Sequence, residues 1–281
     1  PYIIQTAAEL QSIQNNLAAY YVLGNDIDMS GVTSWTPIGT SSAPFTGQFD
    51  GNGKTISNLV SSSGGIFGTI GRNSVIKNTN LESFSLSGVD NQACMVGSVT
   101  GTTANVKIQN IIASNSKVID SIRSAIILGF SPPGQSALIS IENSECHNCI
   151  VTGGVRIGGI CAGTGSIGSE FDVINCKAVN CFIYTTDHES LASPIVGDWY
   201  SLAGSSQIIN CVVDSCTGVN TGGGIVGRCW TSAANTHIQI IDNCVVKDSS
   251  FINVNTDNAL GGVCGNFGTP WFEVSECVIQ N

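Results

Sequence analysis

The chain has 281 residues, of which 42% are hydrophobic and only 11% charged, and its formal net charge is −10. The charged share is less than half of the roughly 25% that is usual in globular domains. No apolar run approaches the ~18 residues that a membrane-spanning helix needs. The few Lys and Arg residues are scattered singly, which argues against binding to nucleic acid or to an anionic bilayer.

The N-terminal section predicts one helix followed by short strands. Residues 6–17 favour a helix, because Thr6 and Glu9 stand in capping-box register and apolar residues follow the helical period at Leu10, Ile13 and Leu17. A stack of coils exposes an open edge at its end, so we expect this helix to cap the first coil. We therefore divide the chain into a cap helix with the first strands at 1–60 and repeats at 61–281, which we expect to continue beyond residue 281.

From residue 64 onward a Gly-apolar-apolar-Gly motif recurs about every 33 residues, first as Gly-Gly-Ile-Phe-Gly at 64–68. Each period also carries two other short apolar runs, joined by Asn, Gly and Ser. A fixed period of this length indicates a stacked repeat architecture. The sequence predicts an all-β, right-handed parallel β-helix of three-stranded coils, about seven repeats of ~33 residues, with an N-terminal capping helix.

Two residue types are expected to shape the corners of the coils. Asn residues in register predict ladders of side-chain amides along the stack. Glycine supplies either a positive φ or a close approach between backbones. The structural corner glycines expected from the motif are Gly65, Gly68, Gly97, Gly129, Gly159, Gly197, Gly224, Gly227, Gly262 and Gly265.

These motifs resemble a known family. The segment 64–68 and its repeats look like the GLUG motif (Gly-Leu-any-Gly), and residues 21–56 resemble the segment that typically precedes such motifs. The family occurs in large bacterial, archaeal and protist surface proteins and adhesins. The resemblance implies the architecture and carries over no catalytic residues. The chain departs from the motif where Cys94, Ile126 and Pro194 replace the first Gly, and where Ala162 replaces the last.

Twelve cysteines are present, and six of them recur at the repeat period as a cysteine ladder: Cys176, Cys211, Cys244 and Cys277 in one register, Cys181 and Cys216 in another. This spacing favours buried free thiols that pack as small hydrophobic side chains. The alternative is disulfides that cross-link a corner of the coil. Cys146-x-x-Cys149 has the spacing of half a zinc site but lacks a second pair. We expect an extracellular or cell-surface location, with an intracellular one left open if the cysteines are free.

Candidate chemistry is sparse. Asp187-His188-Glu189 with Asp198 is the best cluster of carboxylates for glycoside hydrolysis, which needs two carboxyl groups, but no catalytic residues are predicted. No cofactor is expected, apart from Ca²⁺ if Asp26, Asp28 and Asp50 converge. The alternative for these three is bonding to their own turns.

Aromatic residues follow the Gly corner and could line one edge of the solenoid as a binding surface: Trp199, Tyr200, Trp230 and Trp271. The leading hypothesis is a non-enzymatic structural or adhesive β-solenoid of a cell-surface or filamentous assembly. Its partners would be other protein subunits or surface glycans. The alternatives are a polysaccharide-degrading enzyme, either a lyase or a glycoside hydrolase, and a carbohydrate-binding module.

Overall fold

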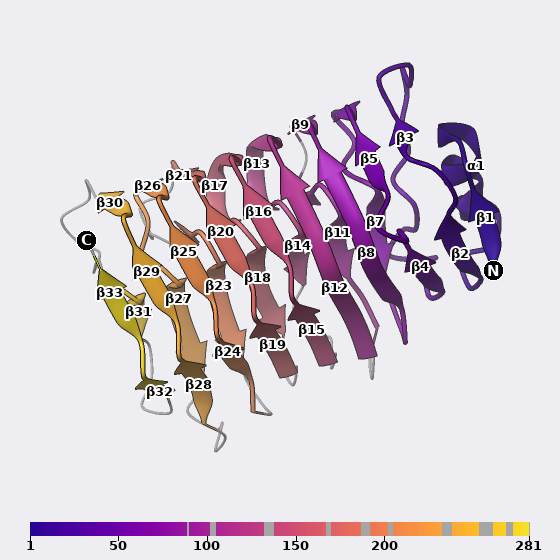
Figure 1. The fold of residues 1–281 in the computed structure, drawn as a ribbon. Coiled ribbons are helices and arrows are strands. Elements are labelled where there is room, and N and C mark those ends of the chain that lie inside the picture. The colour runs from indigo at the N-terminus through magenta and orange to yellow at the C-terminus, as the bar shows by residue number, and fades with distance from the viewer. Residues whose placement is uncertain are drawn as a thin grey trace.

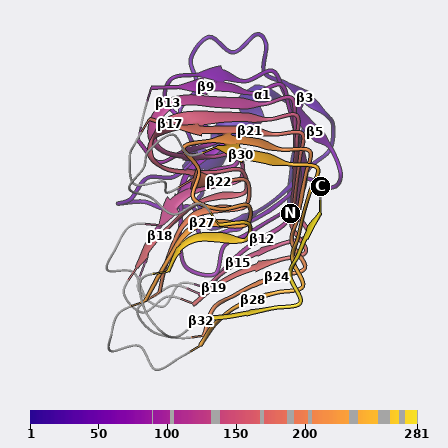
Figure 2. The same ribbon diagram turned by 90° about the vertical axis from the view of Figure 1, so that its left-hand side faces the viewer.

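The computed structural model describes residues 1–88, 90–101, 105–131, 138–166, 170–186, 192–201, 205–231, 238–252, 261–267 and 272–280. The chain forms stacked coils of parallel strands, a β-solenoid of about seven turns, which confirms the predicted fold class. Figure 1 shows the coils following one another along the stack in chain order, and Figure 2 shows them from the end. Among the described residues the strands form three sheets, named A, B and C. Along the chain each repeat contributes strands first to sheet A, then to sheet C and then to sheet B.

Sheet A has 17 strands. They are β1 (Tyr2–Ile4), β2 (Tyr20–Leu23), β3 (Ile27–Asp28), β4 (Gln48–Asp50), β5 (Thr55–Ser57), β8 (Val75–Glu82), β12 (Asn105–Ser114), β15 (Leu138–Glu142), β16 (Glu145–His147), β19 (Glu170–Ile174), β20 (Lys177–Val179), β24 (Gln207–Ile209), β25 (Val212–Asp214), β28 (Gln239–Asp242), β29 (Val245–Lys247), β32 (Phe272–Ser275) and β33 (Val278–Gln280).

The other two sheets are smaller, with nine strands in sheet C and seven in sheet B. Sheet C contains β6 (Val60–Ser61), β9 (Ser85–Ser87), β10 (Gln92–Ala93), β13 (Lys117–Ala125), β17 (Ile150–Gly158), β21 (Phe182–Thr185), β22 (Ala192–Ser193), β26 (Thr217–Val219) and β30 (Ser250–Ile252). Sheet B contains β7 (Phe67–Ile70), β11 (Val96–Val99), β14 (Leu128–Ser131), β18 (Cys161–Ser166), β23 (Val196–Ser201), β27 (Val226–Thr231) and β31 (Cys264–Phe267).

The helix at the N-terminal end is shorter than expected. It comprises α1 (Ala7–Ser12) and one 3₁₀ turn (Ile13–Asn15), and it lies at the N-terminal end of the stack (Figure 1). Thr6 caps it by accepting a hydrogen bond from the backbone N–H of Glu9 at 3.2 Å, as the capping box predicts. Leu10 and Ile13 are fully buried, so the helix contributes its apolar face to the core.

The N-terminal strands belong to the same stack as the repeats. β1 pairs with β2, β2 with β4, and β4 with β8, all in parallel register within sheet A. β5 also pairs with β8. Residues 1–60 therefore supply the first coils of the solenoid as well as its helical end.

The core runs down the centre of the stack as columns of identical or similar side chains. Neighbouring coils pair in register, so an apolar residue in one coil lies over its counterpart in the next. One such column is fully buried and consists of Ile76, Ile108, Ile141, Val173, Ile208 and Ile241. Burial of such side chains contributes roughly 1.5–3 kcal/mol each, which makes these columns the main source of stability.

Two corners of each coil use a left-handed residue, and Asn supplies most of them. At the corner within sheet A, φ lies between 49° and 55° for Asn78, Asn110, Asn143, Asn175, Asn210 and Asn243. Asn tolerates this conformation better than other non-glycine residues. The side-chain amides also form a ladder, because Nδ2 of Asn175, Asn210 and Asn243 each donates to Oδ1 of the preceding Asn, at 3.0, 2.9 and 2.8 Å.

The corner glycines serve close approach between coils. A Cβ added at Gly97 would lie 2.7 Å from the carbonyl oxygen of Gly68, and one added at Gly68 would lie 2.6 Å from that of Gly39. Neither glycine has a positive φ. Of the two roles that the sequence suggested for glycine, Gly68 and Gly97 therefore serve close approach between backbones, and Asn supplies most of the left-handed corners.

Seven of the twelve cysteines directly follow a left-handed corner residue, and their side chains pack in or against the core. All twelve are free thiols, buried except for half-buried Cys277. Cys176, Cys211, Cys244 and Cys277 continue one column, and their thiols lie 3.6–3.8 Å from carbonyl oxygens of the preceding coil. Burial and the neighbouring thiols raise the pKa of Cys211. A protonated, buried thiol is a poor nucleophile.

Candidate functional site

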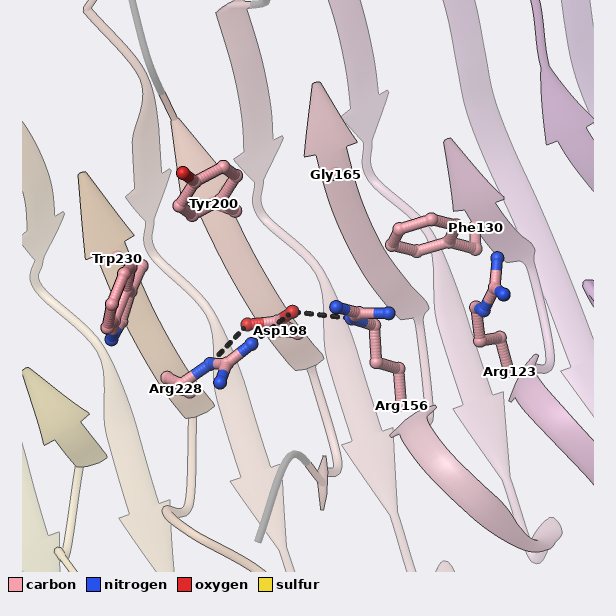
Figure 3. A pocket seen from close by; sticks show the side chains of 8 residues that line it. All are labelled: Arg123, Phe130, Arg156, Gly165, Asp198, Tyr200, Arg228 and Trp230. Atoms are coloured by element: carbon pink, nitrogen blue, oxygen red, sulfur yellow. Dashed lines mark hydrogen bonds and ion pairs between the residues drawn. The ribbon is translucent and has the colours of Figure 1, made fainter. Parts of the chain in front are cut away.

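A cavity lined by charged and aromatic side chains lies on the outer face of sheet B (Figure 3). We call it the sheet B groove, and its volume is about 420 Å³, within the range of roughly 300–1,000 Å³ that is typical of ligand sites. It crosses four consecutive coils. It is lined by Arg123, Phe130, Arg156, Gly165, Asp198, Tyr200, Arg228 and Trp230.

The aromatic wall of the groove comes from two adjacent strands. Tyr200 on β23 and Trp230 on β27 are register partners, and their ring centroids lie 6.1 Å apart with the planes tilted by 36°. Trp230 is 42% exposed. Two of the four aromatic residues predicted for a binding edge therefore form a pair at the surface.

The prediction that Trp199 shares this exposed edge is wrong. Trp199 is fully buried and packs against Phe272, with ring centroids 5.7 Å apart. Successive side chains of a strand point to opposite faces, so Trp199 must face the core when Asp198 and Tyr200 face outward. Trp271, the fourth residue predicted, lies outside the described residues.

An ion-pair cluster forms the base of the groove. Asp198 is only 1% exposed, and its carboxylate accepts from Nε and Nη2 of Arg228 at 2.9 and 3.0 Å. Nε of Arg156 donates to the same carboxylate at 2.6 Å. Figure 3 shows Asp198 held between the two guanidinium groups. Bidentate Arg–carboxylate pairs are strong and directional, so Asp198 fixes both arginines in position.

At the opposite end of the groove, the aromatic ring of Phe130 lies close to the guanidinium groups of Arg123 and Arg156. The guanidinium carbons of Arg123 and Arg156 each lie 4.8 Å from the centroid of Phe130, close enough for cation–π attraction. Gly165 lies beneath, and a Cβ there would collide with the ring of Phe130 at 2.5 Å. Glycine at this position therefore leaves room for the ring and lowers the floor of the groove.

The other predicted site residues are not brought together in this way. Asp28 accepts bonds from Ser30 and Asn58, and Asp50 accepts bonds from Asn52 and Asn78 and pairs with Lys77. The bonds from Ser30 and Asn52 match the turn-bonding alternative, whereas Asn58 and Asn78 belong to the next coil. The Ca²⁺ site stays a prediction. Within the described ranges, no group of three or more His, Cys, Asp and Glu side chains could hold a metal ion.

The carboxylate cluster suggested for hydrolysis is only partly placed. Asp187, His188 and Glu189 lie outside the described residues. Asp198 is placed, but its oxygens are occupied by Arg156 and Arg228, so it is poorly suited to proton transfer.

Sequence reasoning missed the arginines as members of the site. Arg123 and Arg156 are 33 residues apart, which is the mean repeat, and they are Cα partners of neighbouring strands. Phe130, Asp198 and Arg228 each directly follow the last residue of a Gly-apolar-apolar-Gly motif. Aligning the repeats on that residue would have placed these side chains in one outward row.

Comparisons with known proteins give two partial matches in sequence and two matches in fold. No protein-family model matches the chain. It is 36% identical over 135 residues to halomucin of Haloquadratum walsbyi, and 32% identical over 127 residues to a "Putative Gly-rich membrane protein" of Evansella cellulosilytica. These matches cover 42% and 40% of this chain but only 2% and 14% of the two relatives, so the chain spans a small part of their length.

Two solved structures share the fold. A Bacteroides ovatus protein named as a "putative immunoglobulin A1 protease" superposes with a TM-score of 0.61 at 20% identity, covering 99% of this chain and 75% of that one. A second, named "IgA1 Protease", gives a TM-score of 0.58 at 13% identity, covering 99% and 21%. At such identities the likeness shows the β-solenoid alone. In the part of the chain that the structure describes, no helix is long and apolar enough to cross a membrane.

Proposed function

We propose that this chain is a structural and adhesive β-solenoid of a surface or filamentous assembly, which contacts glycans or other proteins through the sheet B groove. The observation that carries the proposal is the groove itself, where four coils present an exposed aromatic pair beside fixed arginines. The stacked coils hold these groups in register and act as a rigid support. The GLUG-like motifs and a relative named as a membrane protein favour the surface location.

The test is binding by the purified chain to panels of immobilised glycans and surface proteins. Trp230→Ala removes the exposed ring of the aromatic pair, and we expect it to abolish the signals. Tyr20→Ala is the matched control, because Tyr20 is also exposed, at 37%, but lies on β2 in sheet A. Binding that survives Trp230→Ala unchanged, or no binding on either panel, would contradict the proposal.

An enzymatic role is the competing candidate, since the two solved structures carry the name of a protease. The second assay is therefore incubation of the chain with polysaccharides and with immunoglobulin A1, followed by measurement of new reducing ends and of protein fragments. We expect neither product. Cleavage of either substrate that is lost in Asp198→Asn would replace the adhesive proposal by an enzymatic one.

A further inference from the structure

A second cavity lies on the outer face of sheet B, nearer the N-terminus than the sheet B groove. We call it the hydroxyl cavity, and its volume is about 410 Å³. Its lining includes hydroxyl side chains, glycines and an amide, among them Thr40, Thr69, Ser98, Gly68, Gly97 and Asn91. A hydroxyl group both donates and accepts hydrogen bonds. The cavity therefore offers hydrogen-bonding groups of both kinds to a ligand.

One outward-facing row of residues runs through both cavities. Thr69 is the register partner of Ser98 on the next strand. Ser98 and Phe130 each lie two residues beyond the register pair Val96 and Leu128, and residues two apart in a strand share a face. Since Phe130 lines the sheet B groove, the row passes from one cavity into the other.

An ion pair lies where the two cavities meet. Arg123 of the sheet B groove contacts Asp90 of the hydroxyl cavity at 3.2 Å, and its Nη1 donates to Oδ1 of Asn91 at 3.3 Å. The other two arginines of the groove bond to the buried carboxylate of Asp198. Because each arginine already has an acidic partner in the protein, a charged ligand would have to compete with these pairs. A neutral ligand would leave them in place.

Together the two cavities extend along most of the stack. Their lining begins at Gly39, whose neighbour Ile38 bridges to Phe67 on β7. It continues through β7, β11, β14, β18, β23 and β27, which are successive strands of sheet B (Figure 1). At about 4.8 Å between adjacent strands, the lining spans roughly 29 Å. A groove of this length fits an extended chain better than a compact small molecule.

The aromatic end of the groove indicates what kind of chain fits. One face of a pyranose ring carries C–H groups, and laying it on the exposed rings of Tyr200 and Trp230 would remove apolar area from water. Arg156 lines the same cavity, and its side chain is 26% exposed. A guanidinium group has five N–H donors, so Arg156 can hold Asp198 and still donate to a sugar hydroxyl. Stacking beside hydrogen-bond donors suits a carbohydrate.

An extended peptide is the competing occupant of such a groove. A peptide that binds to a sheet as an added strand needs a free strand edge for backbone pairing. β14, β18 and β23 lie beneath the groove, and each is paired on both sides. A sugar chain bonds through its hydroxyl groups and needs no free edge, so these observations favour the carbohydrate.

We propose that the sheet B groove and the hydroxyl cavity form one site for a neutral linear polysaccharide. The sugar chain lies along the stack, with one ring on Tyr200 and Trp230 and further sugars bonded to the hydroxyl groups around Ser98. This inference rests on the proposed adhesive function and specifies the ligand class and the extent of its site.

The experiment is calorimetric titration of the whole chain with neutral oligosaccharides of increasing length. The probes are the disaccharide and the hexasaccharide of the cello-, xylo-, manno- and malto- series. We expect one hexasaccharide to bind at least about 10-fold more tightly than its disaccharide, because one or two further hydrogen bonds are sufficient for that factor. Its affinity should change less than about 2-fold with added salt, because the ligand carries no charge to be screened.

Variants assign the effect to the two cavities. Ser98→Leu places an apolar side chain between them, so the hexasaccharide should bind no more tightly than the disaccharide. Trp230→Ala should abolish binding of both lengths. Ser85→Leu is the control, since Ser85 is a half-buried serine like Ser98 but lies on β9 in sheet C. Circular dichroism checks that each variant is folded, and the length dependence of the unaltered chain is independent of any variant.

Each remaining outcome overturns the inference in a distinguishable way. Equal binding of disaccharide and hexasaccharide would refute the extended site while leaving glycan adhesion in place. Tighter binding of hexagalacturonate than of every neutral hexasaccharide would replace the neutral ligand by an acidic one. Tighter binding of an extended Gly-Ser peptide would replace the sugar by a peptide. No binding of any sugar would refute the ligand class, and the panel of surface proteins would then decide the adhesive function separately.

Discussion

Substitution of Asn210 tests whether the amide ladder holds the corner of sheet A together. Asn210 has a φ of 55°, donates to Asn175 at 2.9 Å and accepts from Asn243 at 2.8 Å. Asn210→Ala removes two hydrogen bonds, each contributing about 0.5–1.5 kcal/mol. It also places Ala in a left-handed conformation that costs about 1 kcal/mol. We expect the free energy of unfolding to fall by about 2–4 kcal/mol.

Two further variants separate these contributions. Asn210→Gly tolerates the positive φ, so it should be about 1 kcal/mol less destabilising than Asn210→Ala. Asn73 has a φ of 60° but lies in a turn outside the ladder. Asn73→Ala should therefore cost only the conformational part, about 1 kcal/mol.

Urea denaturation followed by circular dichroism measures all three variants. The midpoint should shift in the order Asn210→Ala, Asn210→Gly, Asn73→Ala, at an unchanged slope. The reasoning is refuted if Asn210→Ala and Asn73→Ala are equally destabilising, because the ladder bonds would then contribute nothing measurable.

Three other predictions concern the thiols, the close-packed glycines and one half-buried carboxylate. In the native chain at most Cys277 should react with a thiol-specific disulfide reagent, whereas in denaturant all twelve thiols should react. Rapid reaction of several cysteines in the native chain would contradict their burial. Gly97→Val should lower the free energy of unfolding by about 3 kcal/mol or prevent folding, because the side chain meets the carbonyl of Gly68. Gly53 is the control, since it has a φ of 70° and open space around it, and Gly53→Ala should lower the free energy of unfolding by about 1 kcal/mol. Burial raises the pKa of Asp172 above its ordinary value, although bonds from Gln207 partly lower it. The folded state therefore holds this proton more tightly, and stability is lost as pH rises through the folded pKa. Asp172→Asn should stabilise the protein at pH 7 and have no such effect below about pH 4, as measured by thermal unfolding at both pH values.

The fold could be predicted because its determinants repeat along the chain. The recurring Gly-apolar-apolar-Gly motif gave the period, and the Asn residues gave the corners that the structure places in the left-handed region. Each coil contacts only its neighbours, so local patterns are sufficient to set the architecture. The helix was shorter than its apolar pattern, because the chain turns into a 3₁₀ segment at Ile13 and ends it at Asn15.

The candidate site was less predictable because it depends on the register between strands and on the face of the sheet to which each side chain points. Trp199 and Tyr200 are neighbours in sequence, but the pleat sends one into the core and the other to the surface. Arg123 and Asp198 lie 75 residues apart and meet only because the intervening coils stack in register. The repeats differ in length, so the residues that stack in neighbouring coils can be recognised in the sequence only after each repeat is aligned on its Gly-apolar-apolar-Gly motif.

The direction of the backbone hydrogen bonds has a mechanical consequence. In all three sheets these bonds join one coil to the next, so they point along the stack (Figure 1). A pull along the axis is shared by three sheets acting in parallel, with the Asn side chains as an additional line of bonds. A sideways pull at one corner instead loads the bonds one after another. The molecule should therefore resist axial tension far better than peeling.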